Sequence, residues 1–185
     1  MNAHEKFHCS NRGVVTVEFA LILPVLLTIA YFSVDVVRIM RTENRLHRVT
    51  AILADAIANQ HLDKGTELSS VIGNNTSAYL RMLDEMLGEG GGGTGVVVTY
   101  LDTTTLNAPS PLLLVYNAGS GFENTGAPDL VALGKSGLIS DVNVAQAEVV
   151  MVECVYDMPK DMFLSNMVYP EKFTSYFITL RKQWR

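Results

Sequence analysis

One long apolar run dominates the N-terminal part of the chain. Residues 14–34 read VVTVEFALILPVLLTIAYFSV and contain a single charged side chain, Glu18. As an α-helix this run is about 30 Å long, the thickness of the hydrocarbon core of a bilayer. It is longer than the roughly 7–15 apolar residues of a secretory signal peptide, and no small-x-small cleavage motif follows it. The pattern predicts a membrane-spanning helix at 14–34, which Pro24 bends or loosens.

The hydrophobic spacing then changes to that of a helix with one buried face. Its apolar members are Leu46, Val49, Leu53 and Ile57. They predict that the helix continues as a stem over 35–62, with a break at 63–65. A second stripe predicts a helix over 77–87, capped by residues 75–77. The apolar members of this second stripe are Leu80, Leu83 and Leu87.

Beyond a glycine-rich stretch the chain alternates as β-strands do. Residues 88–95 read GEGGGGTG and lack the Gly-Lys-Ser/Thr ending of a phosphate-binding loop, so we interpret them as a linker. Four strands are predicted, at 96–101, 112–116, 147–156 and 173–180. The third is apolar on both faces, which predicts a central position, and residues 117–137 are typical of a long surface loop. The predicted fold class is α+β: a long N-terminal transmembrane helix, an accessory helix and an antiparallel sheet of about four strands.

Composition and charge narrow the function classes. The chain has 185 residues, a formal net charge of −5 and 48% hydrophobic residues, which fits one domain with an appended segment. With 14 basic and 19 acidic residues it lacks the basic surface that nucleic-acid binding needs. Residues 49–180 hold five basic and 15 acidic residues, whereas residues 1–48 hold six basic and four acidic ones. This asymmetry is typical of a membrane-proximal stem that carries a solvated head.

A short polar leader precedes the apolar run and ends at a glycine. Residues 1–13 carry Lys6 and Arg12, and Glu18 follows five residues after Gly13. A carboxylate inside lipid costs up to several kcal/mol, depending on its depth, so Glu18 needs a partner. Cleavage after Gly13 would create an α-amino group on Val14, which on a neighbouring chain could pair with Glu18.

The residues around this glycine resemble a known family. A basic leader, a glycine, four residues, Glu-Phe and a long apolar helix resemble a type IV prepilin. The sequence GVVTVEFAL at 13–21, with Pro24 soon after, is most similar to the TadE/TadF-like minor pseudopilins of the tight adherence (Tad) pilus system. Residues 149–163 resemble a late strand of proteins in that family, and the basic residues at 180–182 resemble their C-terminal segment. A TadE-type and a TadF-type subunit both fit.

The resemblance implies a role for each matching residue. An aspartic prepilin peptidase would cut between Gly13 and Val14 on the cytoplasmic side. Glu18 would set the register of the helix among neighbouring subunits, and Phe19 would lie beside it at the packing surface. The chain would then consist of a leader at 1–13, a transmembrane helix at 14–34, a stem at 35–62 and a head at 63–185.

The resemblance also implies a location, partners and a function. The protein would cross the bacterial inner membrane once, with its N-terminus in the cytoplasm and its head in the periplasm. Its partners would be prepilin peptidase, other minor pseudopilins, pilus assembly platform proteins and inner-membrane lipid. It would be a non-enzymatic structural or assembly component, without a cofactor, of a Tad-type (type IVb/Flp) pilus used for adhesion and biofilm formation.

The charges after the span conflict with this orientation. Four arginines follow it: Arg38, Arg41, Arg45 and Arg48. By the positive-inside rule they would place the C-terminal flank in the cytoplasm. The leader motif requires the opposite orientation, because the peptidase must reach Gly13 from the cytoplasm. We expect the leader motif to decide, with the arginines on an exposed stem that meets anionic lipid head groups or acidic partners.

The candidates for metal or nucleophile chemistry are few. A structural metal site usually takes four ligands, but His4, His8 and Cys9 have no second cluster and lie in the predicted leader, so no metal is expected. Neither His47 nor His61 lies in a recognisable catalytic pattern, and both are expected on helix surfaces.

One thiol and a group of acids complete the candidates. Cys154 lies on an apolar strand face and is expected to be buried. An acidic group is expected to be solvated, with Glu153 as the buried exception; its members are Glu148, Glu153, Asp157 and Asp161. Two rivals remain open: an uncleaved single-pass protein whose periplasmic head binds a ligand or partner, and a membrane-anchored enzyme with Glu153 as the first place to look.

Overall fold

The fold is described here from a computed structural model. It describes residues 5–60, 67–88, 93–103, 111–120, 129–135, 147–157 and 172–182, with backbone alone at 5–14, 134, 135, 147 and 182. Two compact units divide the chain. The first forms around the N-terminal helix up to Arg41, and the second begins at Thr42 and contains the sheet.

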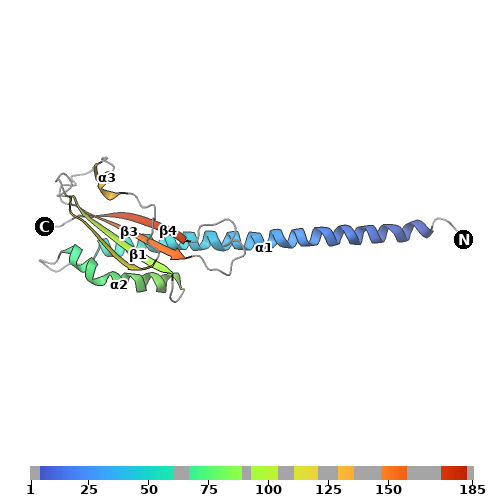
Figure 1. Cartoon of the computed structure of the whole chain (residues 1–185), viewed down its shortest axis with the longest axis horizontal. Coiled ribbons are helices and arrows are strands. Elements are labelled where there is room, and N and C mark those ends of the chain that lie inside the picture. The colour runs from blue at the N-terminus through green and yellow to red at the C-terminus, as the bar shows by residue number, and fades with distance from the viewer. Residues whose placement is uncertain are drawn as a thin grey trace. The chain divides into compact units, whose positions relative to one another are not determined.

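A single helix, α1, runs over Glu5–Ala58 (Figure 1). The apolar run and the stem stripe are thus parts of one helix, as the sequence predicts. The stripe is confirmed as the buried face of the stem, since Leu46, Leu53 and Ile57 are all fully buried. The predicted break at 63–65 lies outside the described residues.

The second helix, α2, runs over Leu68–Leu87 and begins well before the predicted position. The prediction of caps at 75–77 is wrong, because these residues lie in the helix interior. There the Asn75 side chain donates to the Val71 carbonyl at 2.9 Å, and the Thr76 hydroxyl donates to the Ile72 carbonyl at 2.7 Å. Such bonds to the preceding turn satisfy polar side chains inside a helix.

The end of α2 agrees with the predicted start of the glycine-rich stretch. Gly88 has φ 72°, and its N–H donates to the Asp84 carbonyl at 3.0 Å. This left-handed conformation favours glycine because a side chain there is strained.

Four strands form one antiparallel sheet in the order β2-β1-β3-β4. Their bounds are Thr94–Asp102 for β1, Leu113–Gly119 for β2, Ala147–Asp157 for β3 and Lys172–Lys182 for β4. All four predicted strands are present, and β3 has the central position that its two apolar faces predict. The α+β fold class is confirmed.

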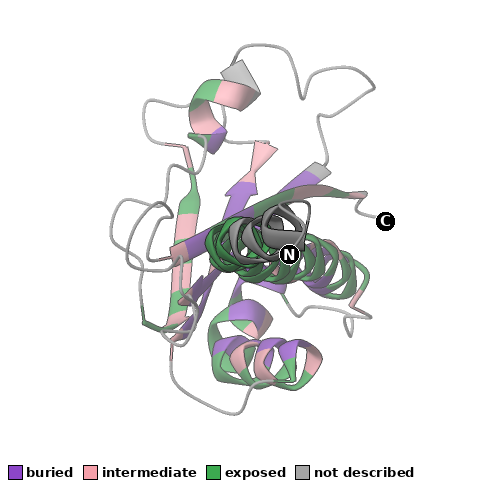
Figure 2. Ribbon diagram, turned by 90° about the vertical axis from the view of Figure 1, so that its right-hand side faces the viewer, coloured by how far each residue is buried: buried purple, intermediate pink, exposed green. Residues whose placement is uncertain are grey.

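Within the second unit, helices lie on both faces of the sheet (Figure 2). The stem of α1 lies on the face that carries Ser175, and α2 packs on the same face, where Gly73 contacts the Tyr116 ring. The opposite face carries α3, Leu130–Lys135, whose Leu130 packs with Leu101, Val149 and Met151.

The helix α3 corrects the prediction of a continuous surface loop over 117–137. Asp129 starts it, because its carboxylate accepts the Val131 N–H at 2.9 Å. A six-residue helix is too short to show a repeated stripe, so its sequence pattern resembles a loop.

Candidate functional site

The apolar half of α1 is exposed around its whole circumference. Every side chain from Val15 to Val34 is exposed, as the green front part of the helix in Figure 2 shows. Leu21, for example, is 69% exposed. This segment is the one helix among the described residues that is long and apolar enough to cross a membrane. An exposed apolar surface this large requires lipid or other helices as its surroundings.

Two of the hydroxyl groups of this half are satisfied by the helix itself. The Thr28 hydroxyl donates to the Pro24 carbonyl at 2.8 Å, and the Ser33 hydroxyl donates to the Ile29 carbonyl at 2.8 Å. In a bilayer no water is available to replace these bonds, so internal satisfaction lowers the cost of burying the hydroxyls in lipid.

Glu18 differs from these residues. It is the one charged side chain between Val15 and Val34, it is exposed, and it makes no hydrogen bond or ion pair with the residues that the structure describes. Phe19, 62% exposed, is its neighbour on the helix. A lone carboxylate among apolar side chains requires a partner from outside the chain.

The predicted processing bond lies within the same helix. Gly13 and Val14 both belong to α1, which begins at Glu5, so Gly13 does not lie in a loop before the helix. Four residues separate Gly13 from Glu18, which places the two little more than one helical turn apart. The four residues predicted to serve processing and assembly therefore lie within one short stretch of α1.

Comparison with protein families agrees with this placement. Residues 13–55 match the family model of TadE-like proteins, which covers the apolar run and most of the stem. The helix is TadE-like. Comparisons with curated proteins and with solved structures found no match. The resemblance of residues 149–163 and 180–182 to this family lies outside the matched range and stays a prediction.

The TadE-like match supports a protein associated with the Tad pilus and a single-pass membrane topology. TadE-like proteins are structural components of the pilus rather than a family of enzymes. The match begins at Gly13, the residue at which the predicted leader ends.

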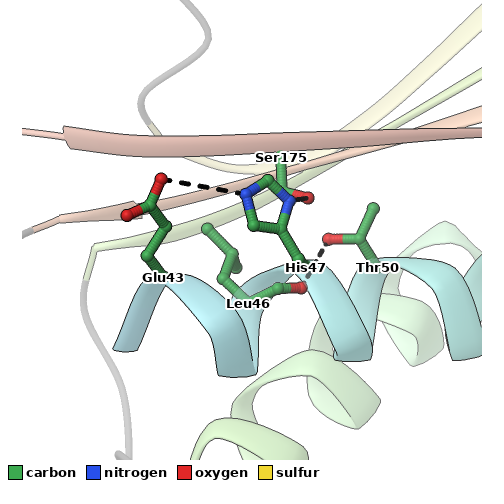
Figure 3. Close-up of polar contacts among 5 residues, drawn as sticks. All are labelled: Glu43, Leu46, His47, Thr50 and Ser175. Atoms are coloured by element: carbon green, nitrogen blue, oxygen red, sulfur yellow. Dashed lines mark hydrogen bonds and ion pairs between the residues drawn. The ribbon is translucent and has the colours of Figure 1, made fainter. Parts of the chain in front are cut away.

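Further along α1, the stem contacts the sheet through polar side chains, a contact that the sequence did not predict. His47 Nδ1 and Ser175 Oγ are hydrogen-bonded at 2.7 Å, and Glu43 Oε1 lies 3.9 Å from His47 Nε2 (Figure 3). His47 was expected to be only a surface residue of the helix. Its ring is exposed on one side and joined to β4 on the other.

These three residues have the composition of a Ser-His-Glu triad, but their geometry does not support nucleophilic catalysis. Ser175 is 2% exposed, so its hydroxyl is closed to a substrate. The distance from Glu43 to His47 exceeds that of a hydrogen bond, so the carboxylate does not orient the imidazole as triad chemistry requires. The contact instead attaches the stem to the edge strand β4.

Cys154 is buried, as its strand face predicts. Burial raises the pKa of its thiol to about 12, although a hydrogen bond with Thr50 of the stem lowers it. A thiol with such a high pKa is almost entirely protonated at neutral pH and is a poor nucleophile.

The prediction that Glu148 is solvated is wrong. Glu148 is buried, and its carboxylate accepts a hydrogen bond from the Tyr100 hydroxyl at 3.0 Å. Its Oε2 lies 3.8 Å from Nε of Arg181, an ion pair between β3 and β4. Burial and the neighbouring carboxylate raise the pKa of Tyr100 well above its usual value. Arg181 also donates to the Gln60 carbonyl at 3.3 Å, which joins the end of the stem to β4.

The remaining residues that the sequence singled out do not come together at one site within the described part of the chain. Glu153 is buried, as expected, and Asp157 is only partly exposed, contrary to the prediction of a solvated acid. His4, His61 and Asp161 lie outside the described residues. So do the side chains of His8 and Cys9.

Proposed function

We propose that this protein is a minor pseudopilin that serves as a structural or assembly component of a Tad-type pilus used for adhesion and biofilm formation. Prepilin peptidase removes residues 1–13, and the helix that begins at Val14 holds the protein in the bacterial inner membrane. The head lies in the periplasm. There it contacts other minor pseudopilins and pilus assembly platform proteins.

The observation that carries the proposal is the exposed Glu18 in an otherwise apolar, TadE-like helix. A neighbouring subunit processed after Gly13 would present an α-amino group close to this depth in the membrane. An ion pair between the two would offset the cost of placing each charge in lipid, and it would fix the register of the two helices.

The first test is the intact mass and N-terminal sequence of the protein purified from membranes of its native cell. The proposal expects a chain that begins at Val14. A Gly13→Leu variant should keep its leader, whereas Ser10→Ala should be processed normally. A wild-type chain that keeps residues 1–13 while prepilin peptidase is active would contradict the proposal and favour the uncleaved ligand-binding alternative.

The second test separates membrane insertion from assembly. Glu18→Ala and Glu18→Gln should insert into the membrane at wild-type levels and fail to support pili, because neither offers a carboxylate to the neighbouring amine. Ser33→Ala is a matched control, since Ser33 is exposed on the same helix and its hydroxyl donates to the Ile29 carbonyl of that helix. Normal piliation with Glu18→Gln would exclude the proposed ion pair.

Orientation is tested separately. A periplasmic reporter enzyme fused after the head should be active if the leader motif decides the orientation. An inactive periplasmic fusion together with an active cytoplasmic one would show that the arginines after the span determine it.

A further inference from the structure

The sheet ends in an edge strand on each side. The order β2-β1-β3-β4 places β2 at one edge and β4 at the other, and no further strand of the described residues pairs with either of them. The inner strands β1 and β3 have neighbours on both sides. An edge strand presents a row of backbone N–H and C=O groups on its outer side, which is a template for pairing with another chain.

The two edges lack the features by which proteins usually block such pairing. Edges are commonly protected by charged side chains, by proline, by bulges or by very short strands. Strand β4 is 11 residues long, and its stretch from Phe173 to Leu180 contains no charge, proline or glycine. Strand β2, from Leu113 to Gly119, contains no charge or proline. The uncharged stretches of the two edges are nearly equal in length.

Both edges also expose apolar side chains on one face of the sheet. This face is the one opposite to the stem. On it Val115 of β2 is 58% exposed and Tyr176 of β4 is 51% exposed, and both Leu113 and Leu180 are exposed beside them. Cross-strand pairs of aromatic, β-branched and other apolar side chains stabilise a sheet. Pairing of β4 with a β2 strand would therefore bury side chains that are now in solvent.

The two edges run in opposite directions. Because neighbouring strands are antiparallel throughout, β1 and β4 run one way while β2 and β3 run the other way. Between two copies of similar orientation, the β4 edge of one therefore meets the β2 edge of the other in the antiparallel direction. Two β4 edges, or two β2 edges, would be parallel in that case. Antiparallel pairs are the more stable per residue.

Strand β4 also runs in the direction of the stem. The His47 ring is hydrogen-bonded to Ser175, and the Gln60 carbonyl accepts from Arg181. Between these two contacts both the stem and β4 advance by about 20 Å. An antiparallel pair of two β4 edges would therefore point the two stems in opposite directions, and the same holds for two β2 edges. Chains that cross one membrane in the same direction cannot form such a pair.

The twist of the sheet limits the pairing of β4 with β2 to two copies. Each strand is turned by about 20° relative to its neighbour, so a second copy, four strands further on, is turned by about 80°. Membrane-spanning helices tilt by up to about 40° from the membrane normal, which accommodates two stems at this angle. A third copy would be turned by about 160°, which two chains in one membrane cannot match.

The helices on the sheet fit a second copy at this distance. The stem contacts β3 and β4, whereas α2 contacts β1 and β2. Four strands are about 19 Å wide, and two packed helices take up about 16–20 Å. A second copy displaced by the width of one sheet would therefore bring its α2 beside the stem of the first copy at an ordinary packing distance.

We propose that the β4 edge of one copy pairs with the β2 edge of a second copy, so that two heads share one continuous antiparallel sheet. A second copy is favoured over a different protein because this chain supplies both edges, opposite in direction, similar in uncharged length and apolar on the same face. Anchoring in one membrane raises the effective concentration of the two copies and favours a contact of modest area. The proposal rests on the membrane anchoring of the proposed function, but not on processing or on pilus assembly.

The test is disulfide cross-linking of the full chain in membranes of its native cell. Two variants with different epitope tags are produced together, one with a cysteine on β4 and the other with a cysteine on β2: Tyr176→Cys with, in turn, Leu113→Cys, Val115→Cys and Asn117→Cys. All carry Cys9→Ser, and Cys154 is kept because it is buried. Oxidation should give a dimer that contains both tags for at least one β2 position, because successive positions on one face of a strand are about 7 Å apart.

Met82→Cys is the matched control. Met82 is exposed on α2, which lies on the face of the sheet opposite to Tyr176. Together with Tyr176→Cys it should give no mixed dimer, since random collisions in the membrane would expose both thiols but strand pairing would keep them apart. The chain with Cys9→Ser alone should give no dimer at all.

Three results would overturn the proposal. One is the absence of a mixed dimer at all three β2 positions, and another is an equally abundant mixed dimer with Met82→Cys. The third is a dimer of Tyr176→Cys alone that is as abundant as the mixed one, which would mean that like edges pair. A cross-link to a different protein in place of the mixed dimer would also overturn it.

The N-terminus of the chain and the presence of pili are determined in the same cells. A chain that begins at Val14 and supports pili without a mixed dimer would contradict the strand pairing alone. A mixed dimer of chains that keep residues 1–13 would contradict the proposed function alone.

Discussion

The two halves of α1 show how one helix is adapted to two kinds of surroundings. Between Val15 and Val34 every side chain is exposed and nearly all are apolar. Between Leu46 and Ala58 most of the large apolar side chains lie on one face, which is buried against the head, and the exposed face is mixed, with His47, Arg48 and Asp55 beside Ile52. A helix that is apolar all round needs lipid or other helices around it, whereas a one-sided helix needs a sheet on one side and water on the other.

Polar groups follow the same division. In the first half the hydroxyls of Thr28 and Ser33 bond to the helix's own backbone, so they make no demand on the surroundings. In the second half the His47 ring is hydrogen-bonded to Ser175 of β4, and just beyond the end of the helix the Gln60 side chain donates to the Tyr79 hydroxyl of α2. The stem thus uses its polar side chains to fix its place in the fold, and the apolar half leaves Glu18 for a partner.

Replacing a leucine by alanine in each half of α1 should give the largest difference, measured as the change in the free energy of unfolding of the head. Leu53 is 0% exposed, so Leu53→Ala should lower the free energy of unfolding of the head by about 2–5 kcal/mol through lost burial and the remaining cavity. Urea unfolding in detergent, followed by circular dichroism, measures it.

The matched variant in the other half is Leu21→Ala. Leu21 is exposed, so the free energy of unfolding of the head should stay within about 0.5 kcal/mol of the wild-type value. A comparable loss from Leu21→Ala would show that the apolar half is packed against the head, contrary to the division described above.

The alkaline stability of the head is expected to depend on Cys154. Its pKa is raised to about 12 by burial, against about 8.5 in an unfolded chain. Because the folded state holds the proton more tightly, this contribution is complete below about pH 8.5 and is lost as pH rises toward 12, at about 1.4 kcal/mol per pH unit. The free energy of unfolding at pH 8 and pH 10 measures it.

Cys154→Ala is the control for the alkaline effect. Its loss of stability from pH 8 to pH 10 should be about 2 kcal/mol smaller than that of the wild type. Equal losses would show that the thiol is not responsible. The raised pKa of Tyr100 acts in the same direction, but only at a higher pH, because an unfolded tyrosine titrates near pH 10.

These elements also show what the sequence could and could not predict. The span, the stem stripe and all four strands follow from the pattern of hydrophobic and polar residues alone. The first half of α2 was missed because Gly73, Asn74 and Asn75 have low helix propensity. Tertiary packing compensates: Gly73 lets the Tyr116 ring approach so closely that a Cβ there would lie 2.7 Å from Cε1.

The polar contacts could not be predicted because their partners are distant in sequence. Ser175 lies 128 residues from His47, and nothing in either local pattern indicates the other. Glu148 was expected in solvent because alternation alone does not show that Tyr100 and Arg181 flank it. At Gly13, Val14, Glu18 and Phe19 the signal is local, so the sequence indicates the candidate site more clearly than it indicates the interior of the head.

A smaller effect is expected from the bond between Tyr100 and Glu148. Tyr100→Phe removes the hydroxyl that donates to a buried carboxylate while it keeps the ring. The free energy of unfolding should fall by about 1–3 kcal/mol, as measured by urea unfolding at pH 7. Tyr176→Phe is the control, since Tyr176 is half exposed and should change stability little. An unchanged midpoint for Tyr100→Phe would mean that the bond is not formed.

The smallest effect concerns the contact between the stem and the edge strand. Ser175→Ala removes the hydroxyl bonded to His47 and should cost about 1 kcal/mol, whereas Thr174→Ala, exposed on the same strand, should cost less than about 0.5 kcal/mol. Hydrogen exchange should show faster opening of the stem in Ser175→Ala, with the exchange of β1 and β3 amides unchanged. Because the buried hydroxyl is closed to substrate, neither variant should alter any ester hydrolysis by the purified protein. Hydrolysis that disappears in Ser175→Ala alone would identify a nucleophile and contradict a purely structural role for the Ser175–His47 contact.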